Sequence, residues 1–187
     1  MTYVTAGVAH GKAIPFLPVL RLFRTFFGIA EQDSATTARE RIAGVASRTP
    51  LVRLDFPDAA AEIWLKLENL QPIGSFKIRG AYNAVRQLTP AQLAHGVWTV
   101  SAGNAAQGVA LAARKVGATS SVLVMDTAPQ TKLRAIERFG ATIVQAPFDE
   151  CWRTVEAHRN DRMTGHCVHP FDDDHLTSAN GTTGRAS

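Results

Sequence analysis

The chain has 187 residues, of which 45% are hydrophobic and 19% charged, a composition typical of a globular protein with one domain or two small ones. No apolar stretch reaches the ~20 residues that a membrane-spanning helix needs, so we expect no membrane partner. Of the formal net charge of +4, Lys12, Arg21 and Arg24 carry three charges, which leaves +1 for the remainder (4 − 3). Because the remainder lacks basic runs, we expect no nucleic-acid partner either.

The two cysteines, Cys151 and Cys167, form no Cys-x-x-Cys pair and give no disulfide framework. Such cysteine usage is typical of proteins in a reducing compartment. We therefore expect a cytoplasmic protein.

Residues 1–36 differ in composition from the rest of the chain and form a predicted N-terminal extension. The run AIPFLPVLRLFRTFFGIA is apolar and basic, contains no acidic residue, and is interrupted by Pro15 and Pro18. Organelle-targeting segments are also basic and poor in acids, but the two prolines and the absence of serine from the run disfavour that interpretation. A mis-assigned start and a helix that caps the domain both stay open.

The next part of the chain mixes helices with short strands. Good helix formers after a threonine predict a helix at 35–45. The segments at 50–56 and 62–68 predict two short strands joined by a Pro-Asp turn. Apolar residues at helical spacing predict a further helix at 75–88, with Ser75 as its N-cap.

From residue 97 on, strands and helices alternate regularly. The predicted strands lie at 97–101, 121–125, 141–145 and 166–171, and the predicted helices at 105–117, 128–140 and 149–159. Pro129 at the start of one helix and Gly140 just past its end fit the usual asymmetry of helix termini. This alternation predicts an α/β fold with a parallel sheet and right-handed connections.

Lys77 lies in the first turn of the predicted helix at 75–88, next to Phe76. Most helix lysines are solvated, and that ordinary role is one interpretation. The other is a lysine that forms a Schiff base. A helix N-terminus carries partial positive charge, which disfavours an ammonium group and favours the neutral amine that this chemistry needs. Phe76 would then cover one side of a flat aromatic cofactor.

The segment SAGNAAQG, residues 101–108, joins a predicted parallel strand to a helix. It is either an ordinary turn or an anion site, because Ser101, Gly103 and Asn104 would direct backbone N–H groups to a helix N-terminus. Ligands of parallel α/β sheets bind at the carboxyl ends of strands. A lysine and a carboxylate-binding turn in one chain predict an amino-acid site.

Four segments carry a resemblance: GSFKIRGA (74–81), SAGNAAQG (101–108), APQTKLRAIERFGA (128–141) and HPFDD (169–173). In this order and separation they resemble the threonine dehydratase and serine racemase group of fold-type II pyridoxal-phosphate (PLP) enzymes, which have a tryptophan synthase β-like fold. The resemblance runs from about Ala38 to Gly184. It implies PLP as the cofactor and a small hydroxy amino acid as the substrate.

The resemblance also implies roles for individual residues. Lys77 would bind PLP as a Schiff base and then remove the α-proton of the substrate, while the cofactor serves as the electron sink. Phe76 would lie against the cofactor, and Asn104 would bind the 3-hydroxyl of its ring. The substrate carboxylate would be bound by the loop of Ser101, Ala102, Gly103 and Asn104. The implied reaction is a β-elimination that converts L-threonine or L-serine to a 2-oxo acid and ammonia.

Two residues depart from the pattern of the group. Racemases have a second serine, which acts as acid and base, where this chain has Ala102. Alanine cannot transfer a proton, so elimination is favoured over racemisation. Ala105 stands where the group usually has histidine, which removes a polar side chain from the loop.

The glycine-rich loop that binds the PLP phosphate in this group has no match in the chain, and NGTTG (180–184) resembles only the turn before it. The resemblance therefore implies a small parallel-sheet domain with an incomplete large domain. The second functional interpretation is a non-catalytic, truncated fragment of such an enzyme. Because an incomplete domain exposes apolar strands, we also expect self-association, for instance as a homo-oligomer.

The predicted division of the chain has four parts. They are the extension at 1–36, the N-terminal part of the large PLP domain at 37–88, the small domain at 89–165, and a return to the large domain at 166–187. A cluster in the last part could pass for a metal site: His166, Cys167, His169, Asp172, Asp173, Asp174 and His175. We predict no metal, because strand alternation sends neighbouring side chains to opposite faces and HPFDD belongs to the resemblance.

Overall fold

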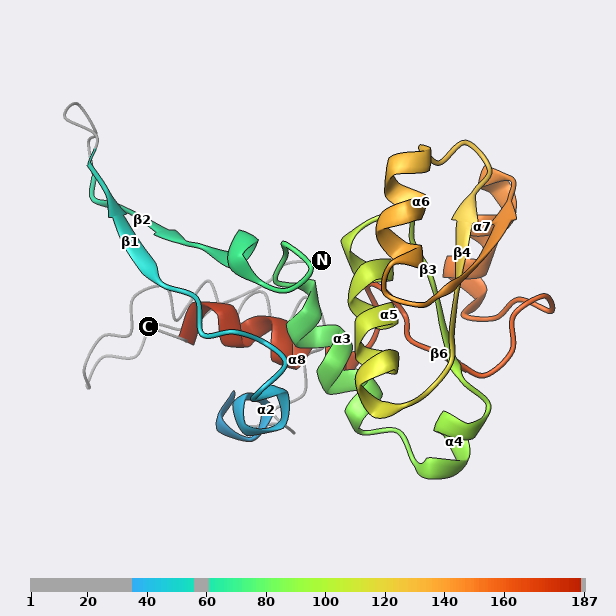
Figure 1. Cartoon of the computed structure of the whole chain (residues 1–187), viewed down its shortest axis with the longest axis horizontal. Coiled ribbons are helices and arrows are strands. Elements are labelled where there is room, and N and C mark those ends of the chain that lie inside the picture. Colours follow the sequence, from blue (N-terminus) through green and yellow to red (C-terminus); the bar gives the residue numbers. More distant parts are fainter. Residues whose placement is uncertain (1–34, 56–60, 186–187) are drawn as a thin grey trace, which may run out of the picture.

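The computed structural model describes residues 35–55 and 61–185 (Figure 1). The expectations for the N-terminal extension and for the Pro57-Asp58 turn fall outside these residues, apart from the last two positions of the extension. In the described part of the chain, no helix has the length and apolar character that crossing a membrane requires.

A four-stranded parallel sheet forms the centre of the larger lobe. Its strands are β3 (Val97–Val100), β4 (Ser120–Met125), β5 (Thr142–Ala146) and β6 (His166–Cys167), in the order β5-β4-β3-β6. All neighbours pair in parallel. The α/β class predicted from the alternating pattern is confirmed.

The strand predicted at 166–171 is shorter than expected. β6 ends at Cys167, and Val168 donates one further hydrogen bond to the Trp98 carbonyl at 2.8 Å. Beyond that point Pro170 has no N–H to donate. The imidazole of His169 binds the next backbone N–H groups, so the ladder cannot continue.

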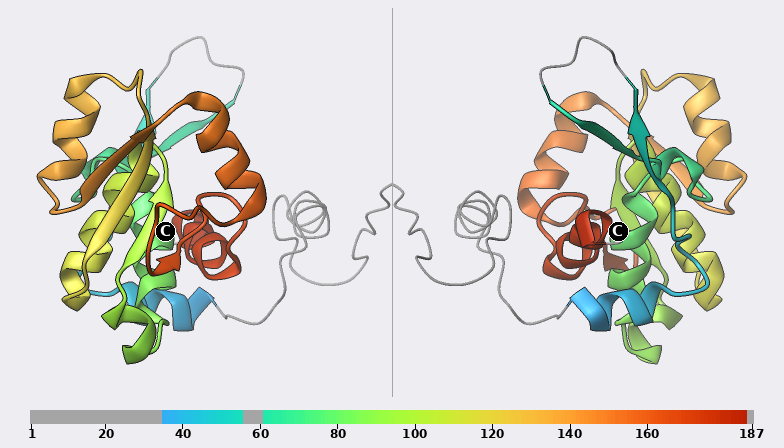
Figure 2. Two further views of the ribbon diagram at one scale, coloured as in Figure 1. Left: turned by 90° about the vertical axis from the view of Figure 1, so that its right-hand side faces the viewer. Right: turned by 90° about the vertical axis from the view of Figure 1, so that its left-hand side faces the viewer.

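Helices cover both faces of this sheet, as Figure 2 shows. On one face, Val122 and Val124 of β4 pack in a cluster with residues of α5 (Asn104–Val116) and α6 (Gln130–Glu137). On the other face, Leu123 packs in a cluster with Cys151 of α7 (Phe148–Ala157). Successive side chains of a strand point to opposite faces, which explains why β4 is apolar throughout.

The helix α3 (Lys77–Arg86) lies between α5 and α8 (Asp174–Asn180), and α2 (Ala35–Ile42) packs beside α8 (Figure 1). Two glycines permit this close packing. A Cβ on Gly108 would lie 3.2 Å from the Lys77 carbonyl oxygen, and a Cβ on Gly80 would clash with the Leu176 carbonyl oxygen. The first turn of α3 is therefore held directly against α5.

The start of α3 differs from the prediction by one residue. Phe76 is the N-cap residue, already with helical angles (φ −58°, ψ −18°), so Ser75 is not the cap. The Ser75 hydroxyl instead accepts a hydrogen bond from the Lys77 N–H at 3.4 Å. Lys77 is thus the first residue of the helix.

The predicted short strands form a separate antiparallel hairpin that projects from the helices (Figure 1). It consists of β1 (Leu51–Leu54) and β2 (Ile63–Lys66), and its apolar side chains are exposed. The short helices η1 (Glu68–Leu70), α4 (Pro90–Ala94) and η2 (Gly181–Arg185) complete the described elements. The division at residues 37, 89 and 166 into parts of two domains stays a prediction.

The packing of α3 against α8 makes Gly80 sensitive to substitution. We expect Gly80→Ala to lower the free energy of unfolding by about 1–3 kcal/mol, because the new methyl group overlaps the Leu176 carbonyl oxygen and lies 2.7 Å from Asn180 Oδ1. Denaturant unfolding measures this change. Gly181→Ala is the matched control, since a Cβ there meets nothing within 4 Å and the change should stay within about 0.5 kcal/mol. Equal effects of the two substitutions would contradict the packing argument.

Candidate functional site

Lys77 lies between two aromatic rings that come from distant parts of the chain. Its Nζ is 5.5 Å from the ring centroid of Phe76 and 5.8 Å from that of Phe171. The side chain is half-buried, and this burial lowers the pKa of the ammonium group. From the sequence, the helix terminus was expected to favour the neutral amine, whereas burial lowers the pKa in the structure. The amine is therefore more readily deprotonated than that of a solvated lysine.

Phe171 is a site residue that the sequence argument did not select. It lies in the segment between β6 and α8, and 71% of its surface is exposed even though its ring lies beside Lys77. The only signal for it was its position within the HPFDD motif. Nothing in the local pattern indicates that this ring would reach a lysine 94 residues earlier in the chain (171 − 77).

The predicted anion loop lies where β3 ends and α5 begins. Ser101 continues the ladder by donating its N–H to the Leu123 carbonyl at 3.1 Å. Its hydroxyl accepts a hydrogen bond from the Gly103 N–H, also at 3.1 Å. Ser101, Ala102 and Gly103 are half-buried, and Asn104 is exposed as the first residue of α5. The Gly103 N–H, which was expected to bind a carboxylate, is thus hydrogen-bonded to the Ser101 hydroxyl.

A small apolar pocket connects this loop to Phe171. It has a volume of about 190 Å³, and Ser101, Ala102 and Phe171 all line it. Because Phe171 also lies beside Lys77, its ring is shared by the lysine and the 101–102 segment. The close contact of Gly108 with the Lys77 carbonyl joins the same two parts through their helices. The structure therefore brings the two predicted motifs to one region, at the carboxyl end of β3.

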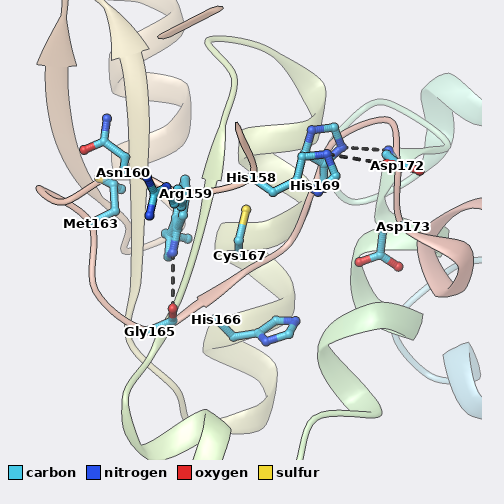
Figure 3. Close-up of a pocket in the computed structure, with 11 residues that line it drawn as sticks. His158, Arg159, Asn160, Met163, Gly165, His166, Cys167, His169, Asp172 and Asp173 are labelled. Carbon is cyan, nitrogen blue, oxygen red and sulfur yellow. Dashed lines mark hydrogen bonds and ion pairs between the residues drawn. The ribbon is translucent and has the colours of Figure 1, made fainter. Parts of the chain in front are cut away.

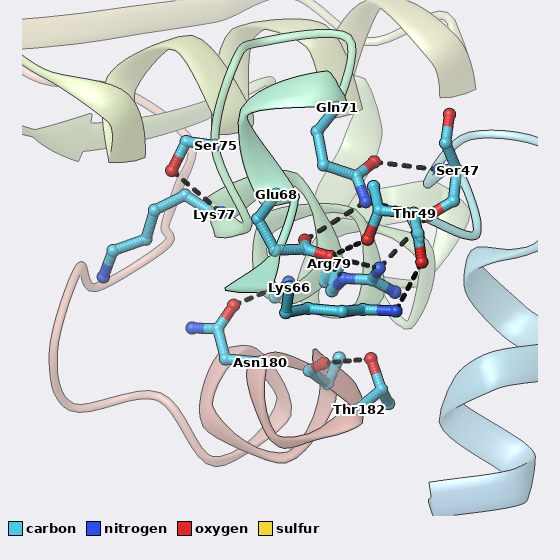
Figure 4. Close-up of polar contacts among 12 residues, drawn as sticks. Ser47, Thr49, Lys66, Glu68, Gln71, Ser75, Lys77, Arg79, Asn180 and Thr182 are labelled. Carbon is cyan, nitrogen blue, oxygen red and sulfur yellow. Dashed lines mark hydrogen bonds and ion pairs between the residues drawn. The ribbon is translucent and has the colours of Figure 1, made fainter. Parts of the chain in front are cut away.

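A buried polar network includes Arg79 of α3, two residues after Lys77 (Figure 4). Arg79 Nε and Nη2 each donate to a Glu68 carboxylate oxygen at 2.8 Å, which makes a two-pronged ion pair. Only 4% of the Arg79 side chain and 11% of the Glu68 side chain are exposed. Thr49 and Gln71 also donate to this carboxylate. The network therefore ties α3 to η1 and to the segment before β1.

The charge state of Glu68 follows from these contacts. Burial by itself would raise the pKa of the carboxyl group. The hydrogen bonds from Arg79 and Thr49 and the positive charge of Arg79 outweigh that effect, so the pKa lies below its ordinary value. Glu68 and Arg79 are both charged at neutral pH. Removing one of them would leave the other buried without a partner.

Two of the residues considered as metal ligands, His169 and Asp173, bind backbone groups. Figure 3 shows His166, Cys167, His169, Asp172 and Asp173 around a pocket of about 440 Å³. In residues 35–55 and 61–185, no three His, Cys, Asp or Glu side chains are grouped as a metal ion requires. Both nitrogens of His169 form hydrogen bonds to backbone groups. Asp173 is the N-cap of α8, where it accepts from the Leu176 N–H at 2.9 Å.

We expect the Glu68–Arg79 pair to be costly to break. Arg79→Ala should lower the free energy of unfolding by about 3–5 kcal/mol, because it leaves the Glu68 carboxylate buried and unpaired. Chemical denaturation at neutral pH measures the change. Glu62→Ala is the control, since the Arg53–Glu62 pair is more than half exposed and its loss should cost about 1 kcal/mol or less. A similar cost for both variants would show that the buried pair has no special role.

The lowered pKa of Lys77 is directly measurable. When an amine-acylating reagent is applied across a pH series, the labelling midpoint of Lys77 should lie below the ordinary lysine value of about 10.5. Peptide mass spectrometry identifies the labelled lysine. The same series in denaturant is the control, because unfolding removes the burial and should return the midpoint to that value. A midpoint that is identical in the folded and unfolded chain would exclude the effect.

Comparisons with known proteins show which family the chain resembles over most of its length. The chain is 44% identical over 126 residues to the L-threonine ammonia-lyase of Thermotoga maritima, which covers 66% of this chain and 31% of that protein. It is 38% identical over 153 residues to the catabolic L-threonine dehydratase TdcB of Staphylococcus aureus, covering 79% of this chain and 44% of that protein. The solved structure of maize serine racemase matches with a TM-score of 0.73 and 30% identity, covering 84% of this chain and 49% of that one.

The resemblance seen in the sequence motifs is thereby confirmed, as is the fold class that it implied. The chain spans less than half the length of each of these three relatives. The family described as pyridoxal-phosphate-dependent enzymes matches residues 42–186. Since this match takes in most of the chain, the protein belongs to the pyridoxal-phosphate-dependent enzyme family.

Proposed function

We propose that the chain carries the lysine side of a PLP site for β-elimination from a small hydroxy amino acid, L-threonine or L-serine. The products are a 2-oxo acid and ammonia. The observation that carries this proposal is the position of Lys77, half-buried between Phe76 and Phe171 on the first turn of α3. Relatives named for threonine ammonia-lyase and threonine dehydratase activity support the choice of substrate.

The residues around Lys77 fit a flat aromatic aldehyde such as PLP. The amine has its pKa lowered by burial, as a carbonyl-binding lysine needs. Phe76 and Phe171 provide apolar surface beside the amine. The segment at 180–184 contributes no open phosphate-binding turn, since Asn180 ends α8 and Gly181–Arg185 forms the helix η2. The described residues therefore fit two parts of PLP: its aldehyde, which would react with the Lys77 amine, and its aromatic ring.

Lys77 would hold the cofactor through Nζ and, once substrate has displaced it, would take the proton from the substrate α-carbon. When bound, PLP supplies an electron sink for the charge that this deprotonation leaves on the substrate. The lowered pKa makes Nζ easier to deprotonate than the amine of a solvated lysine, as a base at this position requires. The two phenylalanine rings limit the access of water to the amine, and so protect it from solvation.

The loop at 101–104 would orient the substrate. Ser101 and the backbone N–H groups at the start of α5 would bind the carboxylate, and Asn104 would face the cofactor ring. In the structure the Ser101 hydroxyl accepts from the Gly103 N–H at 3.1 Å. The hydroxyl keeps its own proton in this contact and could donate it to the carboxylate. For the Gly103 N–H to bind the carboxylate as well, it would have to turn from the serine to the substrate.

Ala102 favours elimination over racemisation. It lines the pocket next to Ser101 and Phe171, and its methyl group cannot return a proton to the second face of the α-carbon. Ala105 is buried at the start of α5 and adds no polar group to the loop. Within this region, Lys77 is thus the side chain suited to move the α-proton. Localisation in the cytoplasm and association as a homo-oligomer stay proposals beside this function.

The test is the visible spectrum of the purified chain with added PLP, followed by an assay of 2-oxo acid formation from L-threonine and L-serine. We expect an absorption band that is lost in Lys77→Ala and that shifts when substrate is added. Lys115→Ala is the matched control, because this exposed lysine lies in the last turn of α5, at the end away from the 101–104 loop. The control should keep the band.

Three outcomes would count against all or part of the proposal. A band that persists in Lys77→Ala would show that PLP reacts with other amines. No band in the wild-type chain would favour the second interpretation, a fragment of such an enzyme without catalytic activity. A band without 2-oxo acid would keep the role of Lys77 and reject the activity of this chain.

A further inference from the structure

We propose that His169 is a positioning residue, which in its neutral form holds the segment at 169–173 so that Phe171 lies beside Lys77. The proposal rests on the proposed function only where it treats Lys77 as the reactive amine. The contacts that carry it concern residues 155–173 and are independent of any cofactor. They give a structural role to His169, a buried histidine that has no part in the proposed chemistry.

The hydrogen bonds of His169 determine its tautomer. Nδ1 accepts from the backbone N–H of Asp172 at 2.7 Å and from that of Phe171 at 3.3 Å. A ring nitrogen that accepts cannot carry a proton, so the proton of the neutral ring lies on Nε2. Nε2 then donates to the Val155 carbonyl of α7 at 3.0 Å. Only the neutral ring with its proton on Nε2 satisfies all three contacts.

These bonds explain how an exposed aromatic ring keeps its place. Phe171 is 71% exposed, so burial does little to hold it. Its backbone is held from both sides, by Pro170, whose ring restricts φ, and by the bonds from residues 171 and 172 to the imidazole. The His169 ring also meets the Phe171 ring edge-on, with centroids 6.2 Å apart at 71°. His169 thus connects α7 to the aromatic ring beside Lys77.

The charged and titratable groups around His169 come from three directions. The ring of His158, at the end of α7, stacks on it with centroids 4.1 Å apart. His158 Nε2 lies 3.4 Å from Asp172 Oδ2, and Asp173 follows on the same segment (Figure 3). Arg159, His166 and Cys167 line the pocket on the other side.

The balance of these surroundings favours the neutral ring. Burial lowers the pKa of His169, and the neighbouring His158 lowers it further. The bond to Val155 and the charges of Asp172 and Asp173 act in the opposite direction without reversing the result. Because the folded pKa lies below the ordinary value of about 6.5, the contribution of this ring to stability is present above that pH. It is lost as the pH falls through the folded pKa.

Protonation would break the connection at a defined atom. A proton on Nδ1 removes the acceptor for the N–H groups of both Phe171 and Asp172. The segment would then lose the bonds that orient Phe171, and Lys77 would lose one of its two aromatic neighbours. The amine would become more exposed to solvent, so the burial that lowers its pKa would be reduced.

Substitutions can separate the two nitrogens of the ring. His169→Asn places an amide oxygen near the position of Nδ1 and keeps an acceptor that does not titrate. His169→Gln places its amide near the position of Nε2 and leaves the two N–H groups unpaired. Phe171→Ala removes the aromatic ring itself and shows the full effect of its loss.

The experiment measures the pH midpoint of Lys77 acylation in the full chain, with the exposed Lys115 labelled in the same samples as a reference. We expect His169→Gln and Phe171→Ala to raise this midpoint toward the ordinary lysine value of about 10.5, because both reduce the burial that lowers the pKa of Lys77. His169→Asn should leave the midpoint at its wild-type value, because the amide oxygen keeps an acceptor for the N–H groups of Phe171 and Asp172. Circular dichroism shows whether each variant is folded. Equal midpoints for the Asn and Gln variants would overturn the proposal.

Nuclear magnetic resonance provides a second measurement without any substitution. The ¹⁵N shifts of the His169 ring should show the proton on Nε2 at pH 8. The amide signals of Phe171 and Asp172 should titrate together with this ring below pH ~6.5 and not in His169→Asn. A proton on Nδ1 would refute the proposal. Amide signals of Phe171 and Asp172 that do not change with the protonation of the His169 ring would refute it as well. Neither measurement uses PLP or activity, so failure of the proposed function would leave this result intact.

Discussion

The close packing of α3 against α5 and α8 is the constraint on which the rest of the site depends. Gly108 lets α5 reach the Lys77 carbonyl, and Gly80 lets α8 reach the middle of α3. A side chain at either position would push the helices apart. Because α5 begins at the 101–104 loop and α8 follows the segment with Phe171, this packing places three separate sequence segments around one amine.

Two sets of polar contacts add to this packing: the Glu68–Arg79 ion pair and the hydrogen bonds of His169. The Glu68–Arg79 pair ties α3 to η1, and burial makes the paired charges costly to separate. The imidazole of His169 holds the segment at 169–173 through three bonds to backbone groups. Both connections join elements that are distant in the chain. Lys77 therefore lies on a helix held by close packing and a buried ion pair, whereas the position of Phe171 depends on a group that can titrate.

The hairpin of β1 and β2, unlike α3, is held with little apolar packing. It buries almost none of its apolar side chains in the described structure, and a two-stranded sheet alone is marginally stable. Its base is held by polar contacts instead, including the bond from Lys66 Nζ to the Thr49 carbonyl at 2.6 Å. The match to the serine racemase structures of Dictyostelium discoideum and maize covers 50% and 49% of those chains.

The sequence by itself determined the α/β class, the alternation of elements and the identity of the lysine and loop motifs, because hydrophobic period, glycines and helix termini are local signals. It also indicated both motifs of the site. It did not indicate the tautomer of His169, the role of Phe171 or the Glu68–Arg79 pair. Those depend on contacts between residues far apart in the chain, which arise only when α3, α7 and the segment after β6 pack together. The end of β6 was misjudged for the same reason, since a side chain, and not the local strand pattern, takes the next N–H groups.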